Sequence, residues 1–196
     1  DALRMLRAVR FCAQLGFPME ERTKQAIREL AFMLRKISAE RIQTELVKLL
    51  VSQHPGEVRI LWETVMAAVL FPWLDAMMDT PQNTPYHCYS VGEHTLRSLD
   101  YVPADKVLRL TMLLHDMAKP ALRTTDERGR DHFKGHPREG ARMAREVMRQ
   151  LKFDNDTTDR VTALVLWHDD NPPVTPANIR RAIRRVGLVQ YPDLFA

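Results

Sequence analysis

Apolar residues in the first part of the chain recur every three or four positions, which is the spacing of a helix with one buried face. In the first stretch these residues are Leu3, Leu6, Val9 and Ala13. Gly16 is placed to end this helix, and Ser38 is a suitable N-cap for a later one. The pattern predicts four helices, at 1–15, 20–35, 39–51 and 57–70, with the last one ended by Pro72.

The helical spacing resumes after residues 79–86, a stretch rich in proline and polar turn residues that we interpret as a linker between two domains. Beyond it the pattern predicts helices at 88–101, 104–116, 138–151, 157–168 and 176–186. A loop rich in glycine and charge, residues 123–136, interrupts them. No segment alternates polar and apolar residues for long enough to predict a sheet. The prediction is an all-α chain of two parts, residues 1–80 and 81–196.

Composition narrows the class of protein without identifying it. The 196 residues are 45% hydrophobic and 28% charged, which is typical of a globular protein with its own core. No apolar run approaches the roughly 20 residues of a membrane span, so we expect no membrane partner. The two cysteines, Cys12 and Cys88, suit a reducing cytoplasm. A net charge of +4 is compatible with a polyanionic partner such as RNA. Because the chain begins at Asp1 without an initiator Met, we interpret it as a piece of a longer protein.

A His-Asp pair at the end of an apolar helical run is the strongest chemical signal. Adjacent residues on a helix point about 100° apart, so His115 and Asp116 can bind one ion only if the helix ends there. We expect Pro120 to end it. Six of the seven histidines lie between His87 and His168. The candidate ligands are His94, His115, Asp116, His132, His136, His168, Asp169 and Asp170, with His87 in reserve.

Imidazole together with carboxylate is typical of a catalytic metal site, whereas a closed structural zinc site favours thiolates. Such a centre lowers the pKa of bound water and polarises a phosphoryl oxygen. A single helical histidine is nevertheless more often packed or exposed than bound to metal, and His54 fits that simpler interpretation. His132 fits a solvated loop equally well, and Asp170 fits a cap for the turn before Pro172. The ligand types do not decide the identity of the metal, which stays open among Mg²⁺, Mn²⁺ and Ni²⁺.

The spacing of these ligands matches a known family. The pattern His94, His115-Asp116, Gly135-His136-x-x-x-Gly140-Ala141 and His168-Asp169 resembles the HD superfamily of metal-dependent phosphohydrolases. The resemblance implies a helical bundle in which His94 is the first ligand and His115-Asp116 is the central, catalytic pair. The closing ligand in that family is an aspartate on a later helix, for which Asp169 is one candidate. Lys119 or Arg123 would then balance charge on the phosphate.

A second motif lies at the start of the chain. Arg4, Arg7 and Arg10, three apart, form a basic stripe followed by Phe11, and this stretch resembles the neck helix of bacterial class II CCA-adding tRNA nucleotidyltransferases. Residues 37–46 resemble the next neck motif of that family. Residues 85–96 resemble the start of its appended HD domain. The resemblance therefore covers essentially the whole chain, in the correct order.

This resemblance implies tRNA, CTP and ATP as ligands. Asp1 and Arg4 would form the template that selects the base, because cytosine and adenine both offer an exocyclic amine beside a ring acceptor. Arg7, which we count among the nucleotide-binding residues, and Arg10 would serve phosphates, the RNA or the fold. An HD domain so placed is expected to act on phosphomonoesters or 2′,3′-cyclic phosphates, trimming damaged tRNA ends.

Nucleotidyl transfer in that family also needs a Gly-Gly turn and a metal-binding carboxylate pair. The sequence contains no Gly-Gly, and we interpret Asp154-Asn-Asp156 as a helix N-cap region. We therefore expect this chain not to add CCA by itself. Two alternatives stay open: a fragment of a poly(A) polymerase, and a degenerate HD domain with an RNA-binding or structural role. A stand-alone HD nucleotide hydrolase is disfavoured by the neck motif.

Overall fold

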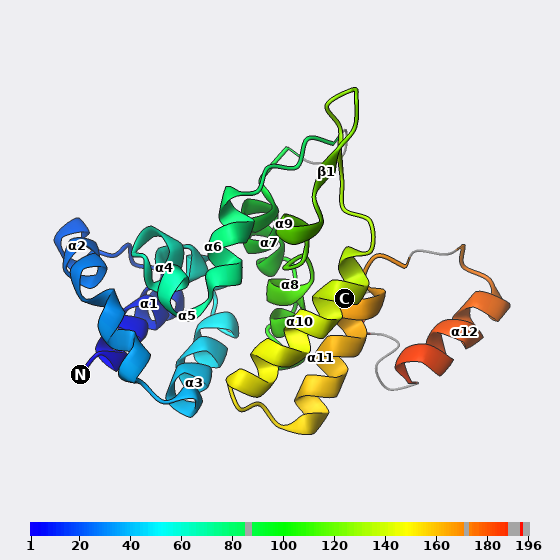
Figure 1. The fold of residues 1–196 in the computed structure, drawn as a ribbon. Coiled ribbons are helices and arrows are strands. Elements are labelled where there is room, and N and C mark those ends of the chain that lie inside the picture. The colour runs from blue at the N-terminus through cyan, green and yellow to red at the C-terminus, as the bar shows by residue number, and fades with distance from the viewer. Residues whose placement is uncertain (85–87, 171–172, 188–192, 194–196) are drawn as a thin grey trace.

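The computed structural model describes residues 1–84, 88–170, 173–187 and 193. The first part of the chain consists of short helices (Figure 1). They are α1 (Leu3–Leu15), α2 (Glu21–Leu30), the 3-10 helix η1 (Ala31–Lys36), α3 (Ala39–Leu50), the 3-10 helix η2 (Pro55–Val58), α4 (Arg59–Glu63), α5 (Met66–Leu70) and α6 (Pro72–Asp79).

The second part holds longer helices and one two-stranded ribbon. These elements are α7 (Val91–Leu99), α8 (Lys106–Leu114), α9 (Lys119–Leu122), β1 (Thr124–Thr125), β2 (Asp131–His132), α10 (His136–Gln150), α11 (Asn155–Trp167) and α12 (Pro176–Val186). The strands are antiparallel, with Thr124 opposite His132 and Thr125 opposite Asp131. Apart from this ribbon, the regular structure in the described ranges is helical, which confirms the all-α prediction.

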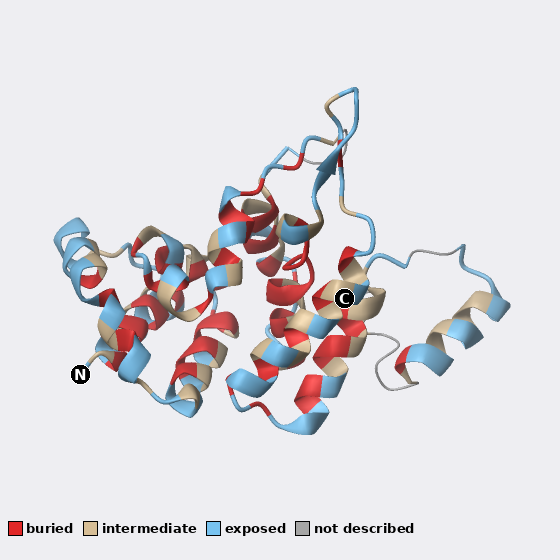
Figure 2. Ribbon diagram, viewed as in Figure 1, coloured by how far each residue is buried: buried red, intermediate tan, exposed pale blue. Residues whose placement is uncertain are grey.

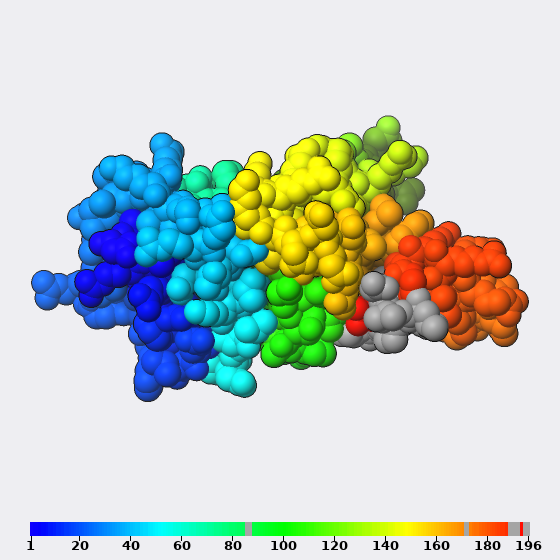
Figure 3. Space-filling view, turned by 90° about the horizontal axis from the view of Figure 1, so that it is seen from below, coloured from blue at the N-terminus to red at the C-terminus, as the bar shows by residue number. Residues whose placement is uncertain are grey.

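The elements follow one another along an elongated molecule (Figures 1 and 3). Helices α1 to α6 occupy one end, α7 to α11 form a central bundle, and α12 lies at the other end, in contact with α11. Within the bundle α10 packs along α11, and α8 packs against α7, α11 and also α3. The ribbon projects from the bundle near α9. None of the helices in the described part of the chain is long and apolar enough to cross a membrane.

One hydrophobic core runs through both parts, so their boundary is not a gap in packing. Figure 2 shows buried residues on the inward faces of helices in both parts of the chain. The largest fully buried side chains are Leu34, Leu49, Leu50, Leu61, Met66, Leu74, Met77, Leu96, Leu99, Leu110, Leu113 and Leu114. Contacts of α6 with α7 and of α3 with α8 make this core continuous between the two parts of the chain.

Several helix ends confirm the local signals in the sequence. Gly16 adopts a left-handed conformation (φ 70°) and donates its N–H to the Cys12 carbonyl, as expected of a glycine C-cap. The Asp154 carboxylate accepts the Thr157 N–H at 2.8 Å, so the Asp154-Asn-Asp156 stretch does form an N-cap. Ser38 occupies the N-cap position of α3, although its hydroxyl makes no capping hydrogen bond.

Other predicted boundaries were wrong. The single helix expected at 57–70 is broken, because Val65 adopts a left-handed conformation (φ 61°) between α4 and α5. The helix before Pro72 ends at Leu70, as expected, but Pro72 also begins α6, and Pro120 lies in the first turn of α9. A proline at the start of a helix loses no hydrogen bond, since its missing N–H would have no partner there. The segment expected as one helix at 20–35 divides into α2 and η1.

Candidate metal centre

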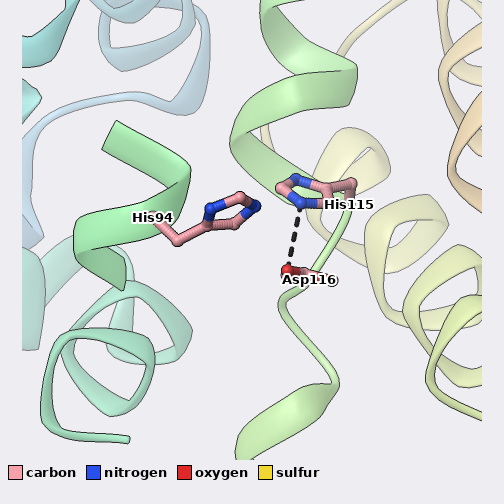
Figure 4. Close-up of side chains that lie close together, drawn as sticks. All are labelled: His94, His115 and Asp116. Atoms are coloured by element: carbon pink, nitrogen blue, oxygen red, sulfur yellow. Dashed lines mark ion pairs between the residues drawn. The ribbon is translucent and has the colours of Figure 1, made fainter. Parts of the chain in front are cut away.

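Helix α8 ends at Leu114, directly before the His-Asp pair. His115 is the C-cap of α8, and Asp116 enters the turn that leads to α9. The chain therefore leaves the helix at the point where the chemistry requires it, although Pro120 is not the cause. Both side chains point into the same space, with His115 Nε2 3.0 Å from Asp116 Oδ2 (Figure 4). The neighbouring side chain in that view, His94, comes from α7, and its ring centroid lies 5.9 Å from that of His115.

Two more histidines approach Asp116 from α10 and α11. His136 is the first residue of α10 and follows Gly135, whose φ of 84° turns the chain into the helix. His168 is the C-cap of α11. Their Nε2 atoms lie 3.3 Å and 3.6 Å from Asp116 Oδ1. Ligand atoms within 4.8 Å of one another thus form two sets that share Asp116: one with His94 and His115, the other with His136 and His168.

Backbone hydrogen bonds fix the tautomer of three of these rings. In His115, His136 and His168, Nδ1 lies at hydrogen-bond distance from a carbonyl oxygen, which can only accept, so Nδ1 carries the proton. The carbonyls belong, in the same order, to Met112 (2.7 Å), Phe133 (2.9 Å) and Val165 (2.8 Å). In the neutral ring this leaves a lone pair on each Nε2. These three Nε2 atoms converge on the Asp116 carboxylate.

This arrangement fits a divalent cation. His136 Nε2 and His168 Nε2 lie 3.2 Å apart, so two lone pairs face each other unless a proton or a cation lies between them. Imidazole nitrogens with one carboxylate are a common ligand set for first-row metals. His94, His115, Asp116, His136 and His168 are therefore the residues that can hold an ion.

Asp116 is the most buried charged residue of the centre, with 1% of its surface exposed. Burial raises the pKa of its carboxyl, but the interactions with His115, His136 and His168, in the form in which these rings also carry a proton on Nε2, outweigh burial and hold that pKa well below its usual value. Lys119 lies next to it, with Nζ 2.7 Å from Asp116 Oδ2 and 3.0 Å from Gln82 Oε1. Asp116 is thus ionised and available as a ligand.

A cavity of about 720 Å³ opens onto these side chains. One side of its wall comes from the ribbon and the segment after it, which contribute Arg130, Phe133 and Lys134. Neither Arg130 nor Lys134 has an ion pair among the described residues, and both are exposed. The cavity therefore combines a buried metal-ligand set with a cationic rim, which suits a phosphate-bearing ligand. The sequence pointed to Arg123, His132 and His136 within residues 123–136, but it did not predict that Arg130 and Lys134 line the cavity.

The other candidate ligands lie outside the centre. Asp169 lines the cavity but is exposed and belongs to neither ligand set. Asp170 forms an ion pair with Arg185. His132 Nε2 lies 2.9 Å from Asp126 Oδ2 in the ribbon turn, and His54 packs against Gly16 in the first part of the chain. His87 lies outside the described residues.

The arginines of α1 divide into two kinds. Arg10 is buried and its Nε lies 3.2 Å from Glu45 Oε2 on α3, so it serves the fold. Arg4 and Arg7 are exposed. Asp1 precedes the helix: one carboxylate oxygen accepts the Leu3 N–H at 3.1 Å, and the other lies 3.1 Å from Arg41 Nη2. Asp1 and Arg4 thus lie close in sequence, but the observed partner of Asp1 is Arg41.

Two family models and several known proteins match this chain. Residues 84–193 match the HD domain, and residues 16–78 match the family described as "Probable RNA and SrmB- binding site of polymerase A". The CC-adding tRNA nucleotidyltransferase of Thermus thermophilus is 35% identical over 99% of this chain and 47% of its own length. The A-adding tRNA nucleotidyltransferase of Deinococcus radiodurans is 32% identical over 94% of this chain and 45% of its own length.

A further relative, the CCA-adding enzyme of Lactiplantibacillus plantarum, is 58% identical, but only over 28% of this chain. The chain spans a little under half the length of the first two relatives. In the Thermus and Deinococcus proteins, the similarity covers both the RNA-binding region and the HD domain. The chain therefore belongs to the HD domain family, and it combines that domain with a polymerase A-type RNA-binding region in the order found in tRNA nucleotidyltransferases.

Proposed function

We propose that the second part of the chain, residues 81–196, is a metal-dependent phosphohydrolase that acts on a phosphomonoester or a 2′,3′-cyclic phosphate of a nucleotide or RNA end. The bound ion would be held by His94, His115, Asp116, His136 and His168. A divalent ion in such a site supplies Lewis acidity toward a phosphoryl oxygen and makes bound water more acidic. Its identity stays open among Mg²⁺, Mn²⁺ and Ni²⁺.

The observation that carries this proposal is the convergence of the Nε2 atoms of His115, His136 and His168 on one buried carboxylate. Each Nδ1–carbonyl bond orients its ring before any ligand arrives, which lowers the cost of assembling the site. Lys119 holds Asp116 by an ion pair and so stabilises its ionised form. Such preorganisation is expected of a working site.

The cationic rim supports phosphate as the ligand class. Arg130 and Lys134 line the cavity as exposed cations, where they would bind the charged oxygens of the substrate. Hydrolysis of a cyclic phosphate then adds one water. Its oxygen joins phosphorus, one ring P–O bond breaks, and the freed hydroxyl takes a proton.

The test pairs elemental analysis of the purified chain with hydrolysis of a 2′,3′-cyclic nucleotide. We expect bound metal and turnover in the wild type, and loss of both in His115→Ala and Asp116→Ala. His132→Ala is the matched control, because His132 lines the same cavity but pairs with Asp126 instead of Asp116. Absence of metal and turnover, even with added Mn²⁺, Ni²⁺ or Mg²⁺, would reject the phosphohydrolase and favour an RNA-binding or structural module.

For the first part, residues 1–80, we propose binding of tRNA and a contribution to selecting CTP and ATP in a tRNA nucleotidyltransferase. The support is that Arg4 and Arg7 are exposed without an ion pair among the described residues, unlike Arg10. The side chains of Asp1 and Arg41 are each about half exposed. Their ion pair is therefore weak, and a nucleotide can displace it.

Filter binding of tRNA tests this second proposal. Removal of both cations in Arg4→Ala/Arg7→Ala should weaken binding and reduce its dependence on salt, because fewer phosphate contacts release fewer counterions. Arg22→Ala on α2 is a control exposed arginine of the same part. Equal loss in the control would mean that the stripe has no special role.

A further inference from the structure

A second cavity lies on the outer side of α7, beside the metal centre. Its volume is about 310 Å³, and it is lined by Tyr89, His94, Arg97, Ser98, Asp100 and Tyr101. His94 also lines the cavity of the metal centre. The same side chain thus forms part of the wall of both cavities, so the two cavities adjoin each other at His94.

Two tyrosines in this cavity are more exposed than their size favours. Tyr101, which follows α7, is 87% exposed, and Tyr89, which precedes it, is 41% exposed. The guanidinium carbon of Arg97 lies 4.4 Å from the centre of the Tyr89 ring. Stacked aromatic and guanidinium planes are the groups that proteins use to bind unpaired bases.

Glu93 holds the Arg97 side chain in this position. Its Nε lies 2.5 Å from Glu93 Oε1, and the other oxygen of Glu93 lies 2.6 Å from Arg59 Nη2. Because Glu93 is fixed from two sides, Arg97 stacks on Tyr89 before any ligand is bound. A preorganised platform loses less entropy on binding than a mobile side chain does.

We propose that this second cavity is a nucleobase subsite, which binds the base of the nucleotide whose phosphate reaches the metal centre. The proposal rests on the proposed phosphohydrolase function, since it names the substrate class of the same site. The base stacks on Tyr89, Arg97 and Tyr101. Asp100 also lines this cavity, and its carboxylate would accept a hydrogen bond from an exocyclic amine, so we expect bases that carry one to be preferred over uracil.

Calorimetric titration in EDTA tests the subsite without turnover. The ligands are AMP, UMP, ribose 5-phosphate and a single-stranded trinucleotide ending in adenosine. AMP and ribose 5-phosphate share the phosphate and sugar, so their difference in Kd reports the base. We expect AMP to bind more tightly, and Tyr89→Ala or Tyr101→Ala to reduce this advantage about fivefold or more, since stacking on one aromatic side chain contributes at least that factor.

Phe32→Ala is the control, because Phe32 is 59% exposed on η1, in the first part of the chain. Equal Kd values for AMP and ribose 5-phosphate would overturn the subsite, whether or not the protein hydrolyses phosphoesters. Hydrolysis of glycerol 1,2-cyclic phosphate, which has no base, tests the phosphohydrolase separately. Tighter binding of the trinucleotide than of AMP, again lost in Tyr101→Ala, would identify an RNA end as the source of the base. Equal binding would identify a free nucleotide.

Discussion

The Nε2 atoms of His136 and His168 lie 3.2 Å apart, and the Nδ1 of each ring is already engaged by a backbone carbonyl. Two neutral rings fixed in this way present their lone pairs to each other, which is unfavourable unless a proton or a cation lies between them. Helices α10 and α11 pack along each other and prevent the rings from moving apart. We therefore expect a metal ion bound at this contact to stabilise the folded bundle.

A divalent ion is expected to raise the melting temperature, and His136→Gln to abolish that increase. At a metal concentration of about 100 Kd the gain is about 2.7 kcal/mol, which corresponds to roughly 5–10 °C for a chain of this size. Thermal unfolding monitored by circular dichroism, with EDTA or with each metal, measures the shift. His132→Gln should retain the full increase. An equal increase in His136→Gln would exclude this histidine as a ligand.

The ligand residues could be named from the sequence, but their grouping could not. His168 and Asp169 are neighbours and were equally good candidates, yet His168 faces Asp116 while Asp169 is exposed. The choice depends on how α11 is rotated against α8 and α10, which is decided by packing across the whole bundle. Sequence spacing carries no information about that rotation. The sequence did not predict the proposed subsite around Tyr89 and Tyr101 either, since two separate tyrosines form no recognisable motif.

The helices themselves were more predictable where one strong periodic face decides them. Residues 176–186 and 39–51 were placed to within one residue of α12 and α3, because apolar spacing and a capping residue agree there. The failures at 57–70 have another cause. A proline is compatible with the end of one helix and the start of the next, and the left-handed conformation of Val65 runs against the preference of a β-branched residue, so no sequence signal predicts it.

Among the arginines of α1, Arg10 is expected to matter for stability and Arg7 is not. The Arg10–Glu45 pair is buried, with side chains 10% and 8% exposed, so Arg10→Met leaves an uncompensated carboxylate in the core. Such a loss costs about 3–5 kcal/mol, whereas Arg7→Met should stay within about 0.5 kcal/mol. Urea unfolding measures both. The double variant Arg10→Met/Glu45→Gln should recover part of the loss, and strictly additive effects would contradict a direct pair.

Acid should weaken the ribbon through Asp131. Burial raises the pKa of its carboxyl, but the Asn83 N–H (2.8 Å), the Thr125 hydroxyl (2.7 Å) and the Arg123 guanidinium (3.0 Å) lower it more, so the folded pKa lies below the usual 3.8. The unfolded chain therefore takes up the proton first as pH falls. The contribution of Asp131 is fully present above pH 3.8 and is lost as the pH falls through the folded value.

Melting temperatures of the wild type and Asp131→Asn across acid pH test this linkage. The variant should melt lower at pH 6, and the difference should shrink as the pH falls below 3.8. Asp159→Asn is a suitable comparison, because the Asp159 side chain is 64% exposed and its ion pair with Arg145 lies at the surface. A difference between wild type and Asp131→Asn that stays constant with pH would contradict the proposed role of the ionised carboxylate.

Gly92 is required by the close approach of α6 and α7, which joins the two parts of the chain. A Cβ atom at this position would lie 2.7 Å from both Cα and N of Met78, and neither backbone atom can move without displacing α6. Gly140 in α10 is the matched control, since its Cβ would lie 3.4 Å from the His115 carbonyl oxygen and a Val165 methyl group.

We expect Gly92→Ala to cost about 1–3 kcal/mol or more through overpacking. Gly140→Ala should cost less, because contacts at 3.4 Å require only a small shift, which the gain of about 1 kcal/mol of alanine over glycine within a helix can offset. Urea unfolding measures both, and equal stability of the two variants would show that α6 and α7 can separate without loss.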